Sequence, residues 1–491
     1  MSLERREFLR LAGLVAAGAT VSACTPVYRL AAEAAEGPTP WIEGDGAIFR
    51  ALNRMTYGPT LMERQHAASV GLGSWIEEQL APWSLDDLWG DLAVRTLTSL
   101  TLQAADLAAW ERDDVIAELQ RGALLRRVHS RRQLFEVMVE FWTDHFNISV
   151  EKGECWLLKT VDDREVIRRH ALGNFRRLLA ASAHSPAMLV YLDNQVNHRE
   201  APNENYAREL LELHTLGVDG GYGQQDVMEM ARCLTGWTVK NRFWKGQFIF
   251  KPEMHDDGPK RVLGMEILPA GQAEAERVLD ALALHPSTAR RLARKLIRRF
   301  LDPIPERAQA LIDRAAQAFL ASDGEILPML RVVLLDGVAA APGQAVPAFK
   351  RPMHVVASAL RMLDAETDGG ELLQTHLARM GQPLFAWPTP DGPPDDPDAW
   401  QTGLLARWDF ACDLARNEMK GTRVDLPTLA VVAGARDEGE AFDALANVLL
   451  GAPLAEPARS EVLRLAAPAD AEESLALLAA GLLASPAFQW R

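Results

Sequence analysis

The chain has 491 residues, a formal net charge of −15 and a sequence pI of about 5.3. Its 48% hydrophobic and 24% charged residues are typical of globular proteins and exclude a chain that is disordered throughout. Because an acidic surface repels phosphate backbones, we expect no nucleic-acid partner. The sequence contains no GxSxG elbow, HExxH motif, Walker A loop, GxGxxG fingerprint or EF-hand loop, so any chemistry rests on less standard clusters.

The first 23 residues have the organisation of a twin-arginine export signal. Arg5 and Arg6 are followed by a spacer, an apolar pair and a basic residue, and residues 11–23 form an apolar stretch. At 13 residues this stretch is too short to span a bilayer and fits a signal-peptide core. The segment 21–24 resembles a lipobox, which predicts lipidation of Cys24; ordinary cleavage near Ala23 is the alternative.

We therefore expect a signal peptide over 1–23, a Pro- and Gly-containing tether over 24–45, and a folded domain over 46–491. The predicted location is the periplasm or the cell surface, with a lipid anchor in a membrane. The remaining cysteines, Cys155, Cys233 and Cys412, show no CxxC spacing, and we interpret them as small buried side chains.

Amphipathic periodicity predicts one helix after another. The predicted helices cover 46–55, 60–81, 112–146, 161–184, 203–216, 225–236, 272–284, 286–301, 305–321, 325–336 and 348–364, with several more after residue 400. Two stretches depart from this pattern: residues 243–264 predict a small hairpin, and the six prolines of 382–400 predict a rigid surface segment. The expected fold is mainly α, as one large multi-helix domain or two packed helical halves with one small β-hairpin.

An acidic stripe marks the first candidate site. Glu136, Glu140 and Asp144 recur every four residues of a predicted helix, with His145 on the neighbouring apolar stripe. Like charges one turn apart destabilise a helix by roughly 0.2–0.5 kcal/mol, which a cation or a basic partner would relieve. Arg132 could pair with Glu136. A solvated acidic face is the alternative.

The second candidate site lies on the predicted helix 203–216, with Asn203 as its N-cap and Gly217 as its stop. It presents Glu204, Arg208 and Glu212 on one face, and Asn205 and Glu209 on an overlapping face. Such a group could bind a divalent cation or hold an acid/base pair, or it could be a self-satisfied ion-pair ladder.

Two loops add polar groups. His255 and Asp256 stand together on a predicted turn, where an imidazole and hard oxygens can ligate a metal. Asp193 follows a predicted helix and is either part of a polar cluster or a helix cap.

Several segments together are similar to the bacterial family called domain of unknown function 1800. The most specific is Asn203-Glu204-Asn205-Tyr206-Ala207-Arg208-Glu209. The others are 52–60, 141–146, 189–194, 210–217, 220–222, 233–237, 255–256, 381–383, 390–392 and 485–489. The pattern departs after Gly392, where Pro393 and Pro394 replace an aromatic residue before proline. The resemblance implies an exported bacterial protein and a co-exported, sulfatase-like partner; it implies no particular reaction.

Two functional hypotheses follow. The first is a metal-dependent enzyme, hydrolytic or oxidative, that acts on envelope or extracellular polymers. Its catalytic residues would be Glu140, Arg208, Glu209 and Glu212, and its metal ligands Asp144, His145, His255 and Asp256. The second is a lipid-tethered binding or scaffold protein for the co-exported partner, with Trp387 and Trp400 on the contact surface.

Overall fold

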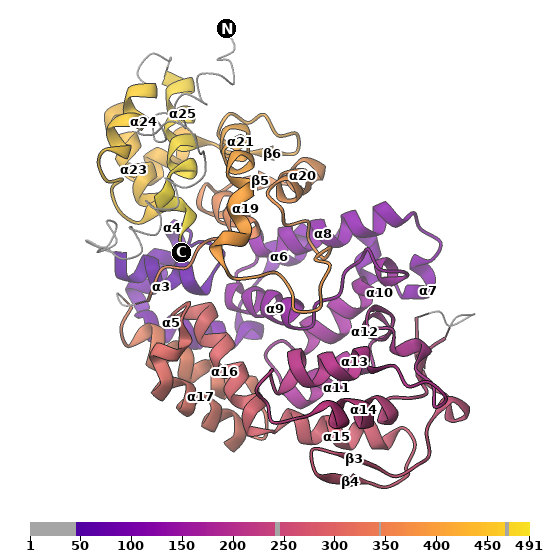
Figure 1. Cartoon of the computed structure of the whole chain (residues 1–491). Coiled ribbons are helices and arrows are strands. Elements are labelled where there is room, and N and C mark those ends of the chain that lie inside the picture. Colours follow the sequence, from indigo (N-terminus) through magenta and orange to yellow (C-terminus); the bar gives the residue numbers. More distant parts are fainter. Residues whose placement is uncertain (1–45, 241–245, 343–344, 467–470) are drawn as a thin grey trace, which may run out of the picture. The chain divides into compact units, whose positions relative to one another are not determined.

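The computed structural model describes residues 46–240, 246–342, 345–466 and 471–491 (Figure 1). The export signal, the tether and Cys24 lie outside these residues. The described chain is mainly α-helical, as predicted, and its strands form three short antiparallel pairs. None of the described helices is both long and apolar enough to cross a membrane.

The chain divides into two compact units. The first contains the described residues up to Val70 together with Pro342–Gly381 and Trp400–Arg491, and the second contains Gly71–Ala341 and Gln382–Ala399. Both units are therefore built from segments that are distant in sequence. Of the two predicted arrangements, the division into two helical parts is the one observed.

The first unit is a group of helices around α21 and α25 (Figure 1). Its helices are α3 (Gly46–Met55), α4 (Leu61–Val70), α19 (Pro352–Met362), α20 (Glu371–Arg379), α21 (Leu404–Ala415), α22 (Leu426–Val432), α23 (Glu438–Leu450), α24 (Ala458–Ala466), α25 (Ala471–Ala484) and the 3-10 turn η10 (Pro486–Gln489). Strand β5 (Glu366–Thr367) pairs with β6 (Thr422–Arg423). Gly451 ends α23 at φ 68°, and a Cβ there would lie 2.3 Å from Cγ of Phe49, so only glycine fits this turn.

The second unit carries most of the predicted site residues. Its α-helices are α5 (Leu72–Leu80), α6 (Leu88–Ala93), α7 (Ala104–Leu107), α8 (Arg112–His129), α9 (Gln133–His145), α10 (Cys155–Asp162), α11 (Phe175–Ala183), α12 (Pro186–Tyr191), α13 (Glu204–Glu209), α14 (Gln224–Cys233), α15 (Ala273–Ala283), α16 (Pro286–Phe300), α17 (Gln309–Ala321) and α18 (Ile326–Arg331). Short 3-10 turns are η1 (Pro82–Ser84), η2 (Thr98–Thr101), η4 (Asn194–Val196), η6 (Pro252–Met254) and η7 (Pro305–Ala308), while η9 (Pro397–Gly403) runs from this unit into the first.

Three segments of the second unit are π-helical: η3 (Asp163–Arg168), η5 (Leu210–Thr215) and η8 (Val332–Ala339). Each continues directly from an α-helix. A π-helical turn widens the backbone spiral, so it changes which side chains share a face, and such turns are frequent at functional sites. The sequence periodicity did not predict them.

The predicted hairpin region contains two hairpins. Strand β1 (Trp237–Val239) pairs with β2 (Phe248–Phe250), and β3 (Lys260–Val262) pairs with β4 (Met265–Ile267). The predicted start of the hairpin at Phe243 lies outside the described residues. A hairpin is therefore confirmed in this region, but the structure has two hairpins where one was predicted.

Three predicted helices are divided in the structure: the predicted helix 161–184 is interrupted over residues 171–174, and two others are each divided at one residue. The predicted helix 112–146 breaks at Ser130, whose backbone is extended and whose hydroxyl donates to Asp87 at 2.6 Å. The predicted helix 60–81 breaks at Gly71, which has φ 83°. In both cases one residue with non-helical dihedrals interrupts a pattern that is amphipathic on either side.

Helix α16 supplies the bases that face the acidic stripe. Pro286 and the His285 cap, whose ring nitrogen accepts from the Ser287 amide at 3.1 Å, start the helix. Its apolar residues are buried. Arg291, Lys295 and Arg299 recur at intervals of four and therefore form a stripe of their own along this helix.

Candidate functional site

The helix of the Asn203 segment is the centre of the candidate site. The Asn203 side chain accepts from the Asn205 amide at 2.9 Å, and Gly217 takes φ 86° beyond the last turn, so both predicted ends are confirmed. The helix changes from α13 to the π-helical η5 after Glu209. The two predicted acids, Glu209 and Glu212, thus stand at and just beyond the change in helix geometry.

Glu209 is a half-buried carboxyl group with a raised pKa. Burial raises its pKa, and the carboxylates of Glu212 and Asp391 raise it further against the opposing charge of Arg208. No hydrogen bond or ion pair joins the Glu209 carboxyl to another side chain of the described residues. A raised pKa favours the protonated form of a carboxyl group, and this is the form that can donate a proton.

The Arg208 guanidinium has two side-chain hydrogen-bond partners. Its Nη2 donates to Glu204 Oε2 at 2.9 Å and to Gln224 Oε1 at 2.9 Å. Gln224 in turn donates to Glu204 at 2.7 Å. The ion-pair ladder therefore describes Glu204 and Arg208, and it does not include Glu209.

Glu212 has a different set of partners. It is hydrogen-bonded to Tyr222, and it is electrostatically coupled to Arg291. The Arg291 Nη2 donates to the Leu213 carbonyl at 3.1 Å, and burial lowers the pKa of Arg291. Glu209 and Glu212 stand one turn apart and therefore have different partners, and Glu212 adds to the raised pKa of Glu209 through its charge.

The proline-rich segment brings a third acid to this helix. Asn147 Nδ2 donates to the carbonyls of Trp387 and Thr389 at 3.1 and 2.7 Å, and Tyr191 Oη donates to that of Pro388 at 2.8 Å. Asp391, which accepts from Thr389 Oγ1 at 2.5 Å, is thereby placed close enough to raise the pKa values of both Glu209 and Tyr191.

Gly392 allows this approach. Its φ is +78°, and a Cβ at this position would lie 2.4 Å from the backbone oxygen of Asp144. Residues 390–392 belong to the family pattern, but neither Asp391 nor Tyr191 was predicted as a site residue. The motif Pro390-Asp391-Gly392 was the sequence feature that could have identified Asp391.

Each member of the acidic stripe on α9 has a basic partner from another helix. Glu136 is bound by Arg168, with N–O distances of 3.0 and 2.5 Å, and Glu140 by Arg299 at 3.2 Å. Asp144 is electrostatically coupled to Lys295. The alternative of a solvated face is wrong for Glu136 and Glu140, which are buried.

Two further details of this stripe differ from the predictions. Arg132 lies 3.9 Å from Asp87 and donates to two carbonyls, so it is not the partner of Glu136. Glu140 forms a buried ion pair within the helix packing, which does not fit a catalytic role. Basic partners on other helices, rather than a cation, relieve the like charges.

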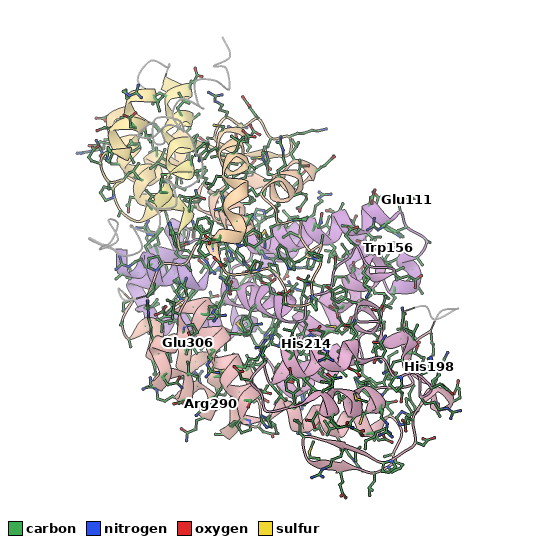
Figure 2. The ribbon with its side chains drawn as sticks, viewed as in Figure 1. Glu111, Trp156, His198, His214, Arg290 and Glu306 are labelled. Atoms are coloured by element: carbon green, nitrogen blue, oxygen red, sulfur yellow. The ribbon has the colours of Figure 1, made fainter. Side chains whose placement is uncertain are left out.

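His145 is part of a buried imidazole pair. Its Nδ1 accepts from the Lys295 ammonium at 2.9 Å, so its Nε2 donates to the His214 carbonyl at 3.0 Å. Both rings are buried among aromatic side chains, and His214 is seen within the second unit in Figure 2. Burial lowers the pKa of His145 and lowers that of His214 to about 3. Burial also lowers the pKa of Lys295 to about 8.

Asp193 and Asn205 are hydrogen-bonded to each other beside helix α13. Lys152 Nζ lies 2.7 Å from Asp193 Oδ2 and donates to the Tyr191 carbonyl at 2.6 Å. Asn205 Nδ2 donates to the Leu192 carbonyl at 3.2 Å and to Asp193 at 3.4 Å. These bonds hold the end of α12 against the start of α13.

His255 and Asp256 belong to a separate network. His255 is buried, with Nδ1 at 2.8 Å from the Thr235 carbonyl and Nε2 at 3.1 Å from Glu274. Arg232 binds both oxygens of Asp256, at 2.7 and 3.1 Å, and this pairing lowers the Asp256 pKa to about 2. Lys260 completes the network with a 2.5 Å contact to Glu274. The charged groups of this network are paired with one another, and the network joins the two hairpins to α14 and α15.

The predicted metal ligands are therefore not gathered into one shell. Within the described ranges, no group of three or more His, Cys, Asp or Glu side chains is arranged to hold a metal ion. The observed arrangement of Glu209, Glu212 and Asp391 fits proton transfer better than metal ligation, because its members are coupled through charge and are bonded to different partners.

Comparison with known proteins gives a match to a family profile. No curated protein and no solved structure matches the chain. One family profile, described as a protein of unknown function (DUF1800), matches residues 50–490. This match covers nearly the whole described chain, including every residue of the candidate site, and it agrees with the resemblance of the separate motifs. The chain therefore belongs to the DUF1800 family.

Proposed function

We propose that this protein is a hydrolase that cleaves envelope or extracellular polymers by acid/base catalysis, with Glu209 as the proton donor. The observation that carries the proposal is the pKa of Glu209, raised by burial and by two neighbouring carboxylates. Pairs of acids whose surroundings separate their pKa values are the usual arrangement for acid/base hydrolysis.

The roles follow from the surroundings of each acid. Glu209, whose raised pKa favours its protonated form, donates a proton to the leaving oxygen, while the exposed Asp391 accepts a proton from the attacking water. The bond to the leaving oxygen breaks as the water oxygen bonds to the substrate. Glu212, which is hydrogen-bonded to Tyr222, helps to raise the pKa of Glu209 through its charge.

The polymer substrate and the place of action rest on the export signal. Arg5, Arg6 and Cys24 support delivery by the twin-arginine route to the periplasm or cell surface, with a lipid anchor. A protein tethered there meets polymers of the envelope and its surroundings. The co-exported, sulfatase-like protein implied by the family resemblance would act on the same material.

The test is an assay of the purified full chain on peptidoglycan and acidic or neutral polysaccharides, measuring released reducing ends. We expect Glu209→Gln to lower kcat by about 10²- to 10⁴-fold with little change in KM. Glu204→Gln, on the same helix but within the Arg208 ladder, is the matched control and should keep its activity. Activity of the wild type should fall as the pH rises through the raised pKa of Glu209.

Full activity of Glu209→Gln on a polymer that the wild type cleaves would contradict the assignment of the proton donor. A wild type that binds polymers or partner protein and cleaves none would favour the binding or scaffold function. The contact surface predicted for that function is corrected in one respect, since Trp400 is buried and cannot contribute to it.

A further inference from the structure

A second site lies in the same unit, away from the Glu209 helix. A pocket of about 440 Å³ is lined by residues of η1, α6, α8, α9 and η3. Five arginines line it: Arg126, Arg132, Arg164, Arg168 and Arg169. Only three acids do so, which leaves an excess of two positive charges. The net charge of the chain is −15, so a locally positive pocket differs from the rest of the protein and points to a negatively charged ligand.

Two of the three acids of the pocket, Asp87 and Glu136, are bonded to protein groups. Asp87 accepts from Ser130 Oγ and from the Arg131 amide, both at 2.6 Å, and burial raises its pKa. Burial would also raise the pKa of Glu136, but the charge and hydrogen bonds of Arg168 outweigh it and lower that pKa. Glu136 therefore neutralises Arg168 by a direct ion pair, which it does not form with Arg126.

Arg126 is the arginine of the pocket with no direct ion pair or hydrogen bond from its guanidinium to the described residues. It lies near the like charge of Arg168, and the carboxylates of Glu136 and Asp163 act on it through charge alone. Burial, followed by Arg168, lowers its pKa to about 10, so it is still charged at neutral pH. Arg169 is mostly exposed and contacts only Glu165, at 3.4 Å. Guanidinium groups placed in this way bind carboxylate, sulfate or phosphate oxygens by charge-assisted hydrogen bonds.

An aromatic wall adjoins these charges. Trp83 is 71% exposed although it lines the pocket, and its ring meets that of Phe135 edge to face at 5.2 Å. Arg132 lies 5.0 Å from the Trp83 ring centre, which fixes the indole from one side. A rigid apolar wall next to a few convergent charges is typical of a pocket for a small, partly apolar anion.

We propose that this pocket binds one negatively charged sugar unit of a polysaccharide. The anionic group contacts Arg126 and Arg169, and the apolar face of the sugar ring packs on Trp83. Two of the arginines, Arg164 and Arg168, come from the π-helical turn η3, which presents them at the pocket. The proposal concerns binding alone and does not depend on acid/base chemistry at Glu209.

The test is calorimetric titration of the purified full chain with four probes: a hexamer of galacturonic acid, a neutral hexasaccharide, inorganic sulfate and inorganic phosphate. We expect the acidic hexamer to bind at least about ten-fold more tightly than the neutral one. Arg126→Gln and Trp83→Ala should each weaken it by about ten-fold or more, the loss expected for one charge-assisted bond or one aromatic contact. Arg169→Gln, at an exposed position where the fold is not at risk, should weaken it as well.

Arg314→Gln is the matched control, because Arg314 is exposed and pairs with Asp336 outside the pocket. Equal binding of the acidic hexamer by Arg126→Gln, Arg169→Gln and the control would overturn the proposal. So would equal affinity for the neutral hexamer. Binding of sulfate or phosphate as tight as that of the acidic hexamer, and insensitive to Trp83→Ala, would show an adventitious ion only. Retained binding by Glu209→Gln separates this site from the proposed catalytic one.

Discussion

At the scale of single residues, the protein keeps several titratable groups away from their ordinary protonation behaviour. Burial and two neighbouring carboxylates raise the pKa of Glu209, and burial together with Lys295 lowers the pKa values of His145 and His214. Each of these groups opposes folding in the pH range where the unfolded chain would ionise it. Such opposition is retained at functional sites more often than elsewhere.

Glu209→Gln should stabilise the protein at neutral pH. The folded-state pKa of Glu209 is raised, so above the unfolded value near 4.3 the unfolded chain gains more by ionising than the folded chain does. Glutamine removes this difference. We expect a Tm increase of roughly 1–3 °C at pH 7 that disappears at pH 4, measured by scanning calorimetry. A lower Tm at pH 7 would show that the carboxylate is stabilised in the fold.

The buried histidines should make the fold sensitive to mild acid. Below the unfolded pKa near 6.5 the unfolded chain takes up protons that the folded His145 and His214 do not, so stability is lost as the pH falls towards 3. The expected slope is up to about 1.4 kcal/mol per pH unit for each histidine. His214→Leu should reduce this slope between pH 6.5 and 5, measured by urea unfolding. An unchanged slope would assign the acid sensitivity to other groups.

At the scale of elements, complementary stripes on different helices determine how the second unit packs. The acids of α9 recur every four residues, and the bases of α16 do the same, so Glu140 meets Arg299 and Asp144 is coupled to Lys295. The acidic stripe was predicted from the sequence, and the basic stripe was not. Its spacing at 291, 295 and 299 was the signal that could have found it.

Glu140→Ala should be strongly destabilising. Glu140 and Arg299 are each about 5% exposed, and the substitution leaves a guanidinium buried without this carboxylate. The expected loss is about 3–5 kcal/mol in the free energy of unfolding. Asp313→Ala breaks the exposed Arg290–Asp313 pair on the same helix α16 and should cost about 0–1 kcal/mol. Equal losses from the two substitutions, measured by urea unfolding, would contradict the buried-pair assignment.

At the scale of the whole molecule, the chain passes between its two units four times. The segment Gln382–Ala399 returns to the second unit after part of the first has been built, and it carries Asp391 to the Glu209 helix. A fragment that ends at residue 341 therefore lacks one acid of the proposed site. The candidate site depends on the complete chain.

The thiols of the complete chain give a direct test of its processing. Burial raises the pKa values of Cys155, Cys233 and Cys412 to about 12, so none of the three should react with a thiol reagent at pH 8 in the native protein. Denatured protein from a native-like host should release three reactive thiols, because a lipid thioether blocks Cys24. Four reactive thiols would contradict lipidation. Rapid reaction of Cys155 or Cys233 in the native protein would contradict their burial, whereas Cys412 is only partly buried and departs from the interpretation of all three as buried side chains.

The sequence by itself determined what depends on local order: the mainly α fold, the Asn203 cap, the Gly217 stop and the two acids of the Asn203 helix. These follow from periodicity and capping, which neighbouring residues decide among themselves. Only the tertiary structure decided which charges meet. It placed Asp391 beside Glu209 across about 180 residues, separated His255 and Asp256 from the other predicted ligands, and buried Trp400. Protonation and ion pairing depend on burial and on partners distant in sequence, and no local pattern encodes either one.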